Sequence, residues 1–182
     1  NGVAILTRTE AEPAEVTQTG LPGQEEFGSR LISANVAGIS FTTLYCPNGK
    51  TLEHADYGRK LDWYETLAEH VAATLRPGDP VVLCGDFNIC PGPNDSWNEA
   101  AMAGQIFHTD DERSRFGAFL AWGLHDLYRE LEPETPGFTW GDYRGGAFHR
   151  KQGLRIDMIL GTAAVRERLQ AACPERDWRK KH

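Results

Sequence analysis

The sequence has few cysteines, no long apolar run and no excess of basic residues, and each absence excludes a class of protein. The cysteines form no Cys-x-x-Cys pair and no spacing typical of zinc; they are Cys46, Cys84, Cys90 and Cys173. Free thiols in a reducing cytosol are therefore expected rather than a disulfide framework. No stretch approaches the roughly 18 consecutive apolar residues of a membrane span, and the first residues lack a secretory signal. We expect a soluble, cytoplasmic protein with no membrane partner.

A net charge of −7 is unfavourable for a protein that binds a polyanion such as nucleic acid. Four positive charges nevertheless lie within a dozen residues, at Arg144, Arg150, Lys151 and Arg155. Such a segment indicates either a contact with nucleic acid or a solvated basic loop. Charge alone leaves both interpretations open.

The length of 182 residues, of which 40% are hydrophobic, is typical of one domain with a sizeable core, residues 1–182. Short apolar, β-branched runs predict strands over residues 3–7, 31–36, 39–45, 80–84, 138–140 and 154–160. Gly38 separates the second and third runs and predicts a β-hairpin. The run 80–84 is apolar throughout, as in a strand buried on both faces, so we expect it at the centre of the sheet.

Helical patterns separate these runs. Between Tyr57 and Leu75, apolar residues recur at spacings of three and four until Pro77-Gly78, which predicts an amphipathic helix. A second helical pattern ends at Gly123, and a short last helix is expected over residues 163–171. Strands and helices interleave without repeats or linkers, so the predicted fold class is α+β, in one layered unit.

The segment 82–89, Val-Leu-Cys-Gly-Asp-Phe-Asn-Ile, places a carboxylate and a carboxamide two residues apart at the exit of the buried strand. On an extended chain this spacing puts both side chains on the same face. Asp86 and Asn88 together are able to orient an attacking water and to supply oxygens to a hard cation. The alternative is an Asx turn that only ends the strand.

A charged pair interrupts the apolar run 153–160. Arg155 and Asp157 alternate with apolar residues, so one face of this predicted strand is polar. A solvent-exposed edge strand explains that pattern. Alternatively, because a carboxylate inside such a run usually has a defined partner, Asp157 is a candidate for holding a histidine in the correct tautomer.

Two aromatic residues also have two interpretations each. Tyr45 ends a strand that runs into a Pro-Asn-Gly turn, where its hydroxyl either donates to a phosphate or only reaches water from the core. Trp140 lies in the segment 138–144, Phe-Thr-Trp-Gly-Asp-Tyr-Arg. Aromatic groups beside basic ones are typical of a nucleic-acid groove, although core packing explains Trp140 almost as well.

Taken in order, these segments resemble the endonuclease/exonuclease/phosphatase superfamily, and within it the exonuclease III type of abasic-site endonuclease. The likeness covers essentially the whole chain and rests on the turn at Tyr45 and on residues 85–88, 122–126, 138–140 and 154–157. It implies a two-sheet β-sandwich flanked by helices, the four-layer fold of deoxyribonuclease I. It also implies hydrolysis of DNA phosphodiesters with Mg²⁺ or Mn²⁺.

The resemblance assigns roles to four catalytic candidates. The residue that matches Asp86 activates or orients the water, the one that matches Asn88 stabilises the pentacovalent phosphate, and both approach the metal. The residue that matches Tyr45 contacts the phosphate, and the one that matches Asp157 supports a catalytic histidine. The implied activities are abasic endonuclease, 3′–5′ exonuclease and 3′-phosphatase in base-excision repair.

The resemblance also implies a DNA interface. The residues that match Trp140 and Leu154 line the pocket for a flipped-out abasic sugar, and Arg144 and Arg155 are further candidate DNA contacts. The implied partner is double-stranded DNA, especially abasic sites and 3′ ends, and a monomer is expected.

The chain departs from the family pattern at both ends. No Glu in it matches the family's principal metal ligand, and His182 follows two lysines rather than the Ser-Asp pair of the family's closing motif. We therefore expect a fragment of the family's domain, with little or no catalysis by these residues alone. The alternatives are a superfamily phosphodiesterase or phosphatase for another substrate, such as RNA or a phospholipid headgroup, and a non-catalytic DNA-binding relic.

Overall fold

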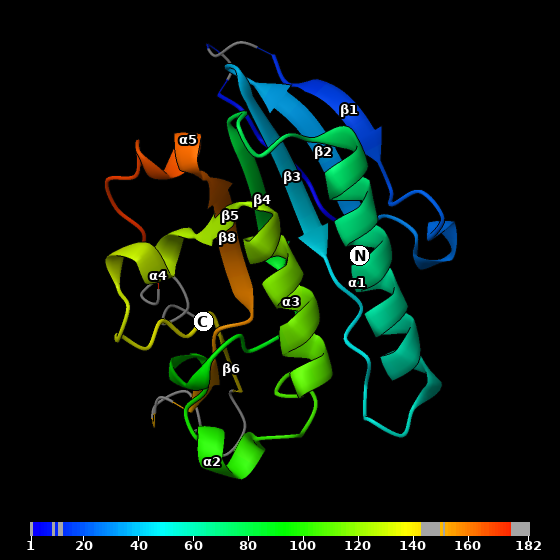
Figure 1. Ribbon diagram of the computed structural model, residues 1–182, viewed down its shortest axis with the longest axis vertical. Helices are drawn as coiled ribbons and strands as arrows, with labels where there is room; N and C mark the ends of the chain where they lie inside the picture. Colours follow the sequence, from blue (N-terminus) through cyan, green and yellow to red (C-terminus); the bar gives the residue numbers. More distant parts are fainter. Residues whose placement is uncertain (1, 9, 11–12, 143–149, 151, 176–182) are drawn as a thin grey trace.

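The computed structural model describes residues 2–8, 10, 13–142, 150 and 152–175, which form a layered α+β unit (Figure 1). Six strands make one mixed sheet in the order β1-β2-β3-β4-β8-β5. Their bounds are Glu15–Thr19 (β1), Leu31–Val36 (β2), Ile39–Tyr45 (β3), Val81–Asp86 (β4), Leu124–Asp126 (β5) and Asp157–Thr162 (β8). The predicted α+β class is confirmed. In the described part of the chain the second sheet is only a two-stranded ribbon of β6 (Trp140–Gly141) and β7 (Gly153–Leu154).

Two long helices, α1 (Ala55–Thr74) and α3 (Asp110–Trp122), cover one face of the sheet (Figure 1). The main core lies between these helices and the strands and includes Leu31, Leu44, Trp63, Leu67, Leu83, Phe116, Phe119, Met158 and Leu160. The shorter helical segments are α2 (Glu99–Met102), α4 (Leu127–Leu131), α5 (Ala163–Arg166), η1 (Glu25–Phe27) and η2 (Pro93–Asp95).

The predicted β-hairpin is formed by β2 and β3, which pair antiparallel from Leu31↔Leu44 to Val36↔Ile39. Ala37 and Gly38 make the turn with φ angles of 49° and 78°. Positive φ at both turn residues matches the right-handed twist of the flanking strands. The hairpin prediction is confirmed.

Strand β4 lies inside the sheet, parallel to β3 and antiparallel to β8. Its buried residues Val81, Val82 and Leu83 belong to the run that the sequence places at the centre, and this prediction is confirmed. Helix α1 forms the crossover between the parallel strands β3 and β4, so it packs on the sheet that it connects.

Local signals mark the start of both long helices and the end of α3. The His54 side chain accepts a hydrogen bond from the backbone N–H of Asp56 at the start of α1. Thr109 and Glu112 form a reciprocal capping box at the start of α3, and Gly123 ends it with a φ of 125°. The predicted helices therefore occur close to their expected bounds.

Three strand predictions need correction. Of residues 138–140, only Trp140 lies in a strand, β6. Residues 3–7 have no strand pairing, although Val3 and Ile5 are partly buried, because alternating burial alone does not require a hydrogen-bonded neighbour. Instead the polar segment Glu15–Thr19 forms β1 at the edge of the sheet. An edge strand with few apolar residues gives no hydrophobic alternation by which to predict it.

The third correction concerns the run 154–160, which is divided between β7 and β8 by Arg155 and Ile156. Helix α5 also ends at Arg166, short of the predicted residue 171. All four cysteines are free, as expected. Among the described residues, no helix has both the length and the apolar character needed to cross a membrane.

Gly85 is the residue of β4 where a side chain is least tolerated, since it has a φ of 129° and an added Cβ would overlap the carbonyl oxygen of Leu44. We predict that Gly85→Ala lowers the free energy of unfolding by about 3 kcal/mol. Gly58 of α1 is exposed and has nothing within 4 Å of an added Cβ. Gly58→Ala, the control, should raise the free energy by about 1 kcal/mol. Denaturant unfolding measures both, and changes of the same sign would contradict this account.

Candidate active site

Strand register brings three of the predicted catalytic residues together. Tyr45 lies opposite Asp86 across β3 and β4, and Asp86 lies opposite Asp157 across β4 and β8. Their neighbours Leu44 and Met158 belong to the helix-covered core. Because successive side chains of a strand alternate, the row formed by Tyr45, Asp86 and Asp157 projects from the opposite face of the sheet.

The fourth candidate, Asn88, follows β4 and is buried in a left-handed conformation with a φ of 52°. Its Nδ2 donates to the carbonyl oxygen of Cys46 at 2.9 Å, and its Oδ1 accepts from Nδ2 of Asn48 at 3.3 Å. Its backbone N–H donates to Oδ1 of Asp86 at 2.8 Å. An Asx turn is therefore present, and it links the Asn88 backbone to the carboxylate row.

The carboxyl of Asp86 has a raised pKa of about 6. Burial is the main cause, and the negative charge of Asp157 adds to it; the N–H of Asn88 and the cations of Lys60 and Arg30 act in the opposite direction. Two carboxylates that lie opposite each other favour a proton or a cation between them.

The same carboxylates determine how well the site suits a divalent metal. Asp86 and Asp157 lie opposite each other, and carboxylate and amide oxygens are the donors that Mg²⁺ prefers. Among the described residues, no group of three or more His, Cys, Asp or Glu could hold a metal. The oxygens of Asp86 and Asp157 suit part of the shell of a cation such as Mg²⁺, which commonly keeps several waters.

Three polar residues near the row were missed by sequence reasoning. Arg30 lies 4.6 Å over the ring of Tyr45 and donates to its carbonyl oxygen at 3.2 Å. Asn48 contacts Asn88, and Lys60 donates to the carbonyl oxygen of Asn88 at 2.7 Å. Asn48 could have been noticed, because it belongs to the turn after Tyr45, whereas nothing local to Arg30 or Lys60 marks them as neighbours of the site.

The predicted DNA-contacting residues differ in how exposed they are. Trp140 is 46% exposed and pairs with the buried Leu154 in the β6–β7 ribbon. Trp97 is 45% exposed, and its backbone N–H bonds to Gly153 in the same ribbon. Sequence reasoning missed Trp97, which has no motif around it. Arg144 lies outside the described residues.

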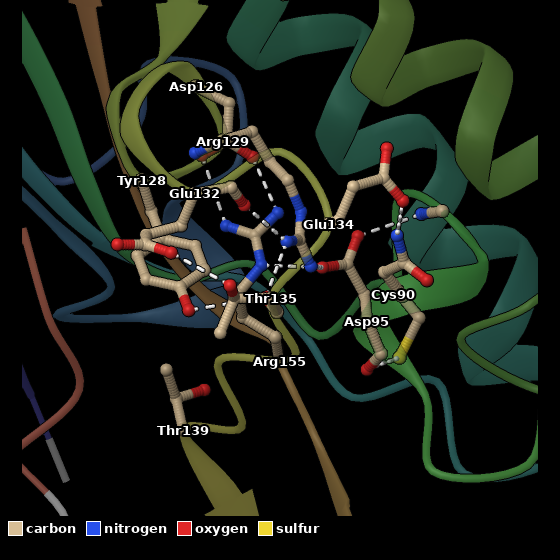
Figure 2. A network of polar contacts seen from close by, with 12 residues as sticks. Cys90, Asp95, Asp126, Tyr128, Arg129, Glu132, Glu134, Thr135, Thr139 and Arg155 are labelled. Carbon is tan, nitrogen blue, oxygen red and sulfur yellow. Dashed lines mark hydrogen bonds and ion pairs between the residues drawn. The ribbon is translucent and has the colours of Figure 1, made fainter.

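Arg155 does not occupy the surface position expected of a DNA contact, since only 1% of it is exposed. Figure 2 shows its guanidinium enclosed by carboxylates and by the ring of Tyr128. Nε donates to Asp95 at 2.6 Å, and the two terminal nitrogens donate to Asp126 at 3.1 and 2.6 Å. Arg129 bonds the same oxygen of Asp95 at 2.5 Å. Arg155 is therefore a structural residue in this conformation.

This charge network holds the break between β7 and β8. The backbone N–H of Arg155 bonds to the carbonyl oxygen of Asp95 at 2.8 Å. The next two N–H groups, of Ile156 and Asp157, donate to Oγ1 of Thr139 at 3.1 and 3.0 Å. The backbone leading to Asp157 is thus fixed from both sides, which sets where its carboxylate enters the row.

Removing one residue from this buried network should lower the free energy of unfolding. We predict that Arg155→Met lowers the free energy of unfolding by about 3 kcal/mol, because the buried carboxylates of Asp95 and Asp126 lose their main cation. Arg166, which is 3.8 Å from Glu130 at the surface, is the control. Arg166→Met should change stability by less than about 0.5 kcal/mol. Equal losses in thermal unfolding would argue against this role.

The raised pKa of Asp86 predicts how stability depends on pH. The folded state binds this proton more tightly than the unfolded chain, so the free energy of unfolding should fall as pH rises through the window from the ordinary 3.8 to about 6. Asp86→Asn should therefore raise the melting temperature at about pH 8, with the gain vanishing at about pH 4. Asp62→Asn, at an exposed position of α1, should have little effect at either pH. A gain independent of pH would refute the electrostatic cause.

Comparison with known proteins gives a consistent result. The sequence model of the Endonuclease/Exonuclease/phosphatase family matches residues 1–178. An exodeoxyribonuclease of Bacillus subtilis is 31% identical over 175 residues, which are 94% of this chain and 67% of that protein. The DNA repair nuclease APEX1 of Danio rerio is 31% identical over 91% of this chain and 52% of its own length.

Solved structures agree. An AP endonuclease from Archaeoglobus fulgidus has a TM-score of 0.80 and 32% identity, and a 3′ phosphatase from Neisseria, bound to a product DNA hairpin, has a TM-score of 0.79 and 35% identity. In both, 86% of this chain matches 61% of the other chain, so the chain spans about three fifths of these relatives. The chain belongs to the endonuclease/exonuclease/phosphatase family, and its homologues there are exonuclease III and AP endonucleases.

Proposed function

We propose that the protein containing this chain is a metal-dependent DNA phosphodiesterase of base-excision repair, which cuts at abasic sites and has 3′–5′ exonuclease and 3′-phosphatase activity. The observation that carries the proposal is the row of Tyr45, Asp86 and Asp157, placed by strand register with Asn88 at its end. The names of the relatives support the choice of substrate. Because they are longer than this chain, we infer that further parts of the protein complete the site and the four-layer sandwich.

Asp86 is the proposed group that orients and deprotonates the water. A pKa raised to about 6 brings this carboxylate closer to the value that suits a general base at neutral pH. Its orientation is fixed by the N–H of Asn88. When bound by Asp86 and Asn88, Mg²⁺ or Mn²⁺ would polarise the phosphate and offset its negative charge.

Asn88 and Tyr45 are the proposed phosphate contacts. One N–H of the Asn88 amide is bonded to Cys46, and we assign the other to a phosphate oxygen. The Tyr45 ring is held by Arg30, which keeps the phenol at the end of β3. Asp157 is proposed to orient a catalytic histidine. The hydrogen bond from its backbone N–H to Thr139 fixes its position and so supports this role.

The proposed partner is double-stranded DNA with abasic sites or 3′ ends, bound by a monomer. The exposed Trp140 and the adjacent Leu154 are our candidates for the pocket that receives the abasic sugar. Arg144 stays a candidate DNA contact. Arg155 is proposed to act on DNA only indirectly, because its ion pairs hold the break that precedes Asp157.

The test is incision of a duplex with one tetrahydrofuran abasic analogue by the protein as its gene encodes it, with Mg²⁺ and with EDTA. We expect cutting only with the metal, and we expect Asp86→Ala to lower kcat by about 100-fold or more. The exposed Asp62 provides the control, Asp62→Ala, which should cut normally. Binding of the duplex without incision would favour a DNA-binding relic, and cleavage of RNA but not DNA would favour another phosphodiesterase.

A further inference from the structure

A buried ion pair joins the two long helices behind the active-site row. Lys60 of α1 and Glu112 of α3 have completely buried side chains, and Nζ lies 2.5 Å from Oε1. The ammonium also lies 4.8 Å from the centre of the Phe107 ring. Two buried charges of this kind often stabilise a fold no better than a well-packed apolar pair, so stability alone does not account for them.

The Lys60 ammonium also contacts the loop that carries Asn88. Three helix side chains donate to carbonyl oxygens of this loop: Tyr64 donates to Phe87, Lys60 to Asn88 at 2.7 Å, and Arg113 to Cys90 at 3.0 Å. These donors come from α1 and α3. The loop thus leaves the sheet with its backbone fixed by helix side chains.

Asn88 is the residue of this loop that most needs such support. Its φ of 52° lies in the left-handed region, which costs energy for a residue with a Cβ. Rotation of its peptide would move the amide away from Cys46 and Asn48. The hydrogen bond from Lys60 opposes that rotation directly, because it ends on the carbonyl oxygen of Asn88 itself.

Glu112 is in turn held from the far side. Its Oε2 accepts from the backbone N–H of Thr109 at 3.1 Å and from the Thr109 hydroxyl at 2.8 Å, while Oε1 bonds Lys60. Because the capping box fixes the Glu112 carboxylate in the first turn of α3, Oε1 offers the ammonium an acceptor at a fixed position. The start of α3 is therefore linked through two side chains to the backbone of Asn88.

We propose that Lys60 is a positioning residue for Asn88, and that Glu112 holds the Lys60 ammonium against the Asn88 carbonyl. The kinetic part of this inference rests on the proposed phosphodiesterase activity. Neither residue touches the phosphate. They instead determine how often the Asn88 amide has the orientation in which it can bind the phosphate.

The first experiment measures kcat and KM on the tetrahydrofuran duplex at saturating Mg²⁺. Lys60→Met should lower kcat about 10-fold with KM changed less than about 2-fold, since it removes the donor but keeps most of the volume. In an Asn88→Ala background the same substitution should change kcat by less than about 2-fold. Equal losses in both backgrounds would overturn the proposal.

Two further variants separate positioning from stability. Lys60→Met with Glu112→Leu replaces the ion pair by apolar groups, so it should melt well above the assay temperature and yet keep the loss of kcat. Val71→Ala removes buried volume from α1 away from the loop, so it should lower the melting temperature without affecting kcat. A double variant with normal kcat would refute the positioning role.

Hydrogen exchange of residues 87–90 supplies a readout that needs no activity. Lys60→Met should increase exchange in this segment about 10-fold relative to Val71→Ala. If exchange increases but no variant, nor the unsubstituted protein, cuts DNA, the positioning role stands and the proposed function fails. If exchange is unchanged, the positioning role fails whatever the protein cuts.

Discussion

The register of the central strand is the constraint on which the site depends. β4 is hydrogen-bonded to β3 on one side and to β8 on the other, and these two pairings place Asp86 beside both Tyr45 and Asp157. A slip of one residue would turn every side chain of β4 to the opposite face and send Asp86 into the core. The absence of a side chain at Gly85 lets the backbone of β3 approach at this point. The chemistry of the row is thus set first by sheet geometry.

The site also concentrates features that do not favour stability. Two carboxylates lie opposite each other, Asn88 has a positive φ, and a lysine and a glutamate are buried behind it. Backbone strain and buried charge of this kind persist where surrounding structure holds them, and they are common at functional sites. Here the core between the sheet and the two long helices provides that surrounding structure.

Local patterns were enough to predict the elements with strong periodicity: the β2–β3 hairpin, α1, β4 and α3. They also indicated the four catalytic candidates, because these lie at or next to the ends of strands in recognisable segments. The polar edge strand β1 was not predicted, because its sequence has no alternation of hydrophobic and polar residues. The break between β7 and β8 at Arg155 was not predicted, because the carboxylates that bind Arg155 are distant in sequence. Asp95 and Asp126 are 60 and 29 residues away along the chain. Lys60 looked like an ordinary helical lysine, and only the tertiary fold shows that it is buried.

The network around Arg155 has a consequence for how this sequence can change over evolutionary time. Arg155 and Arg129 share Asp95, and Arg155 also pairs with Asp126 (Figure 2). A lineage that altered one of these residues alone would leave an unmatched charge in a buried place. Substitutions at these positions should therefore occur together or not at all. The four positions are expected to co-vary among homologous sequences.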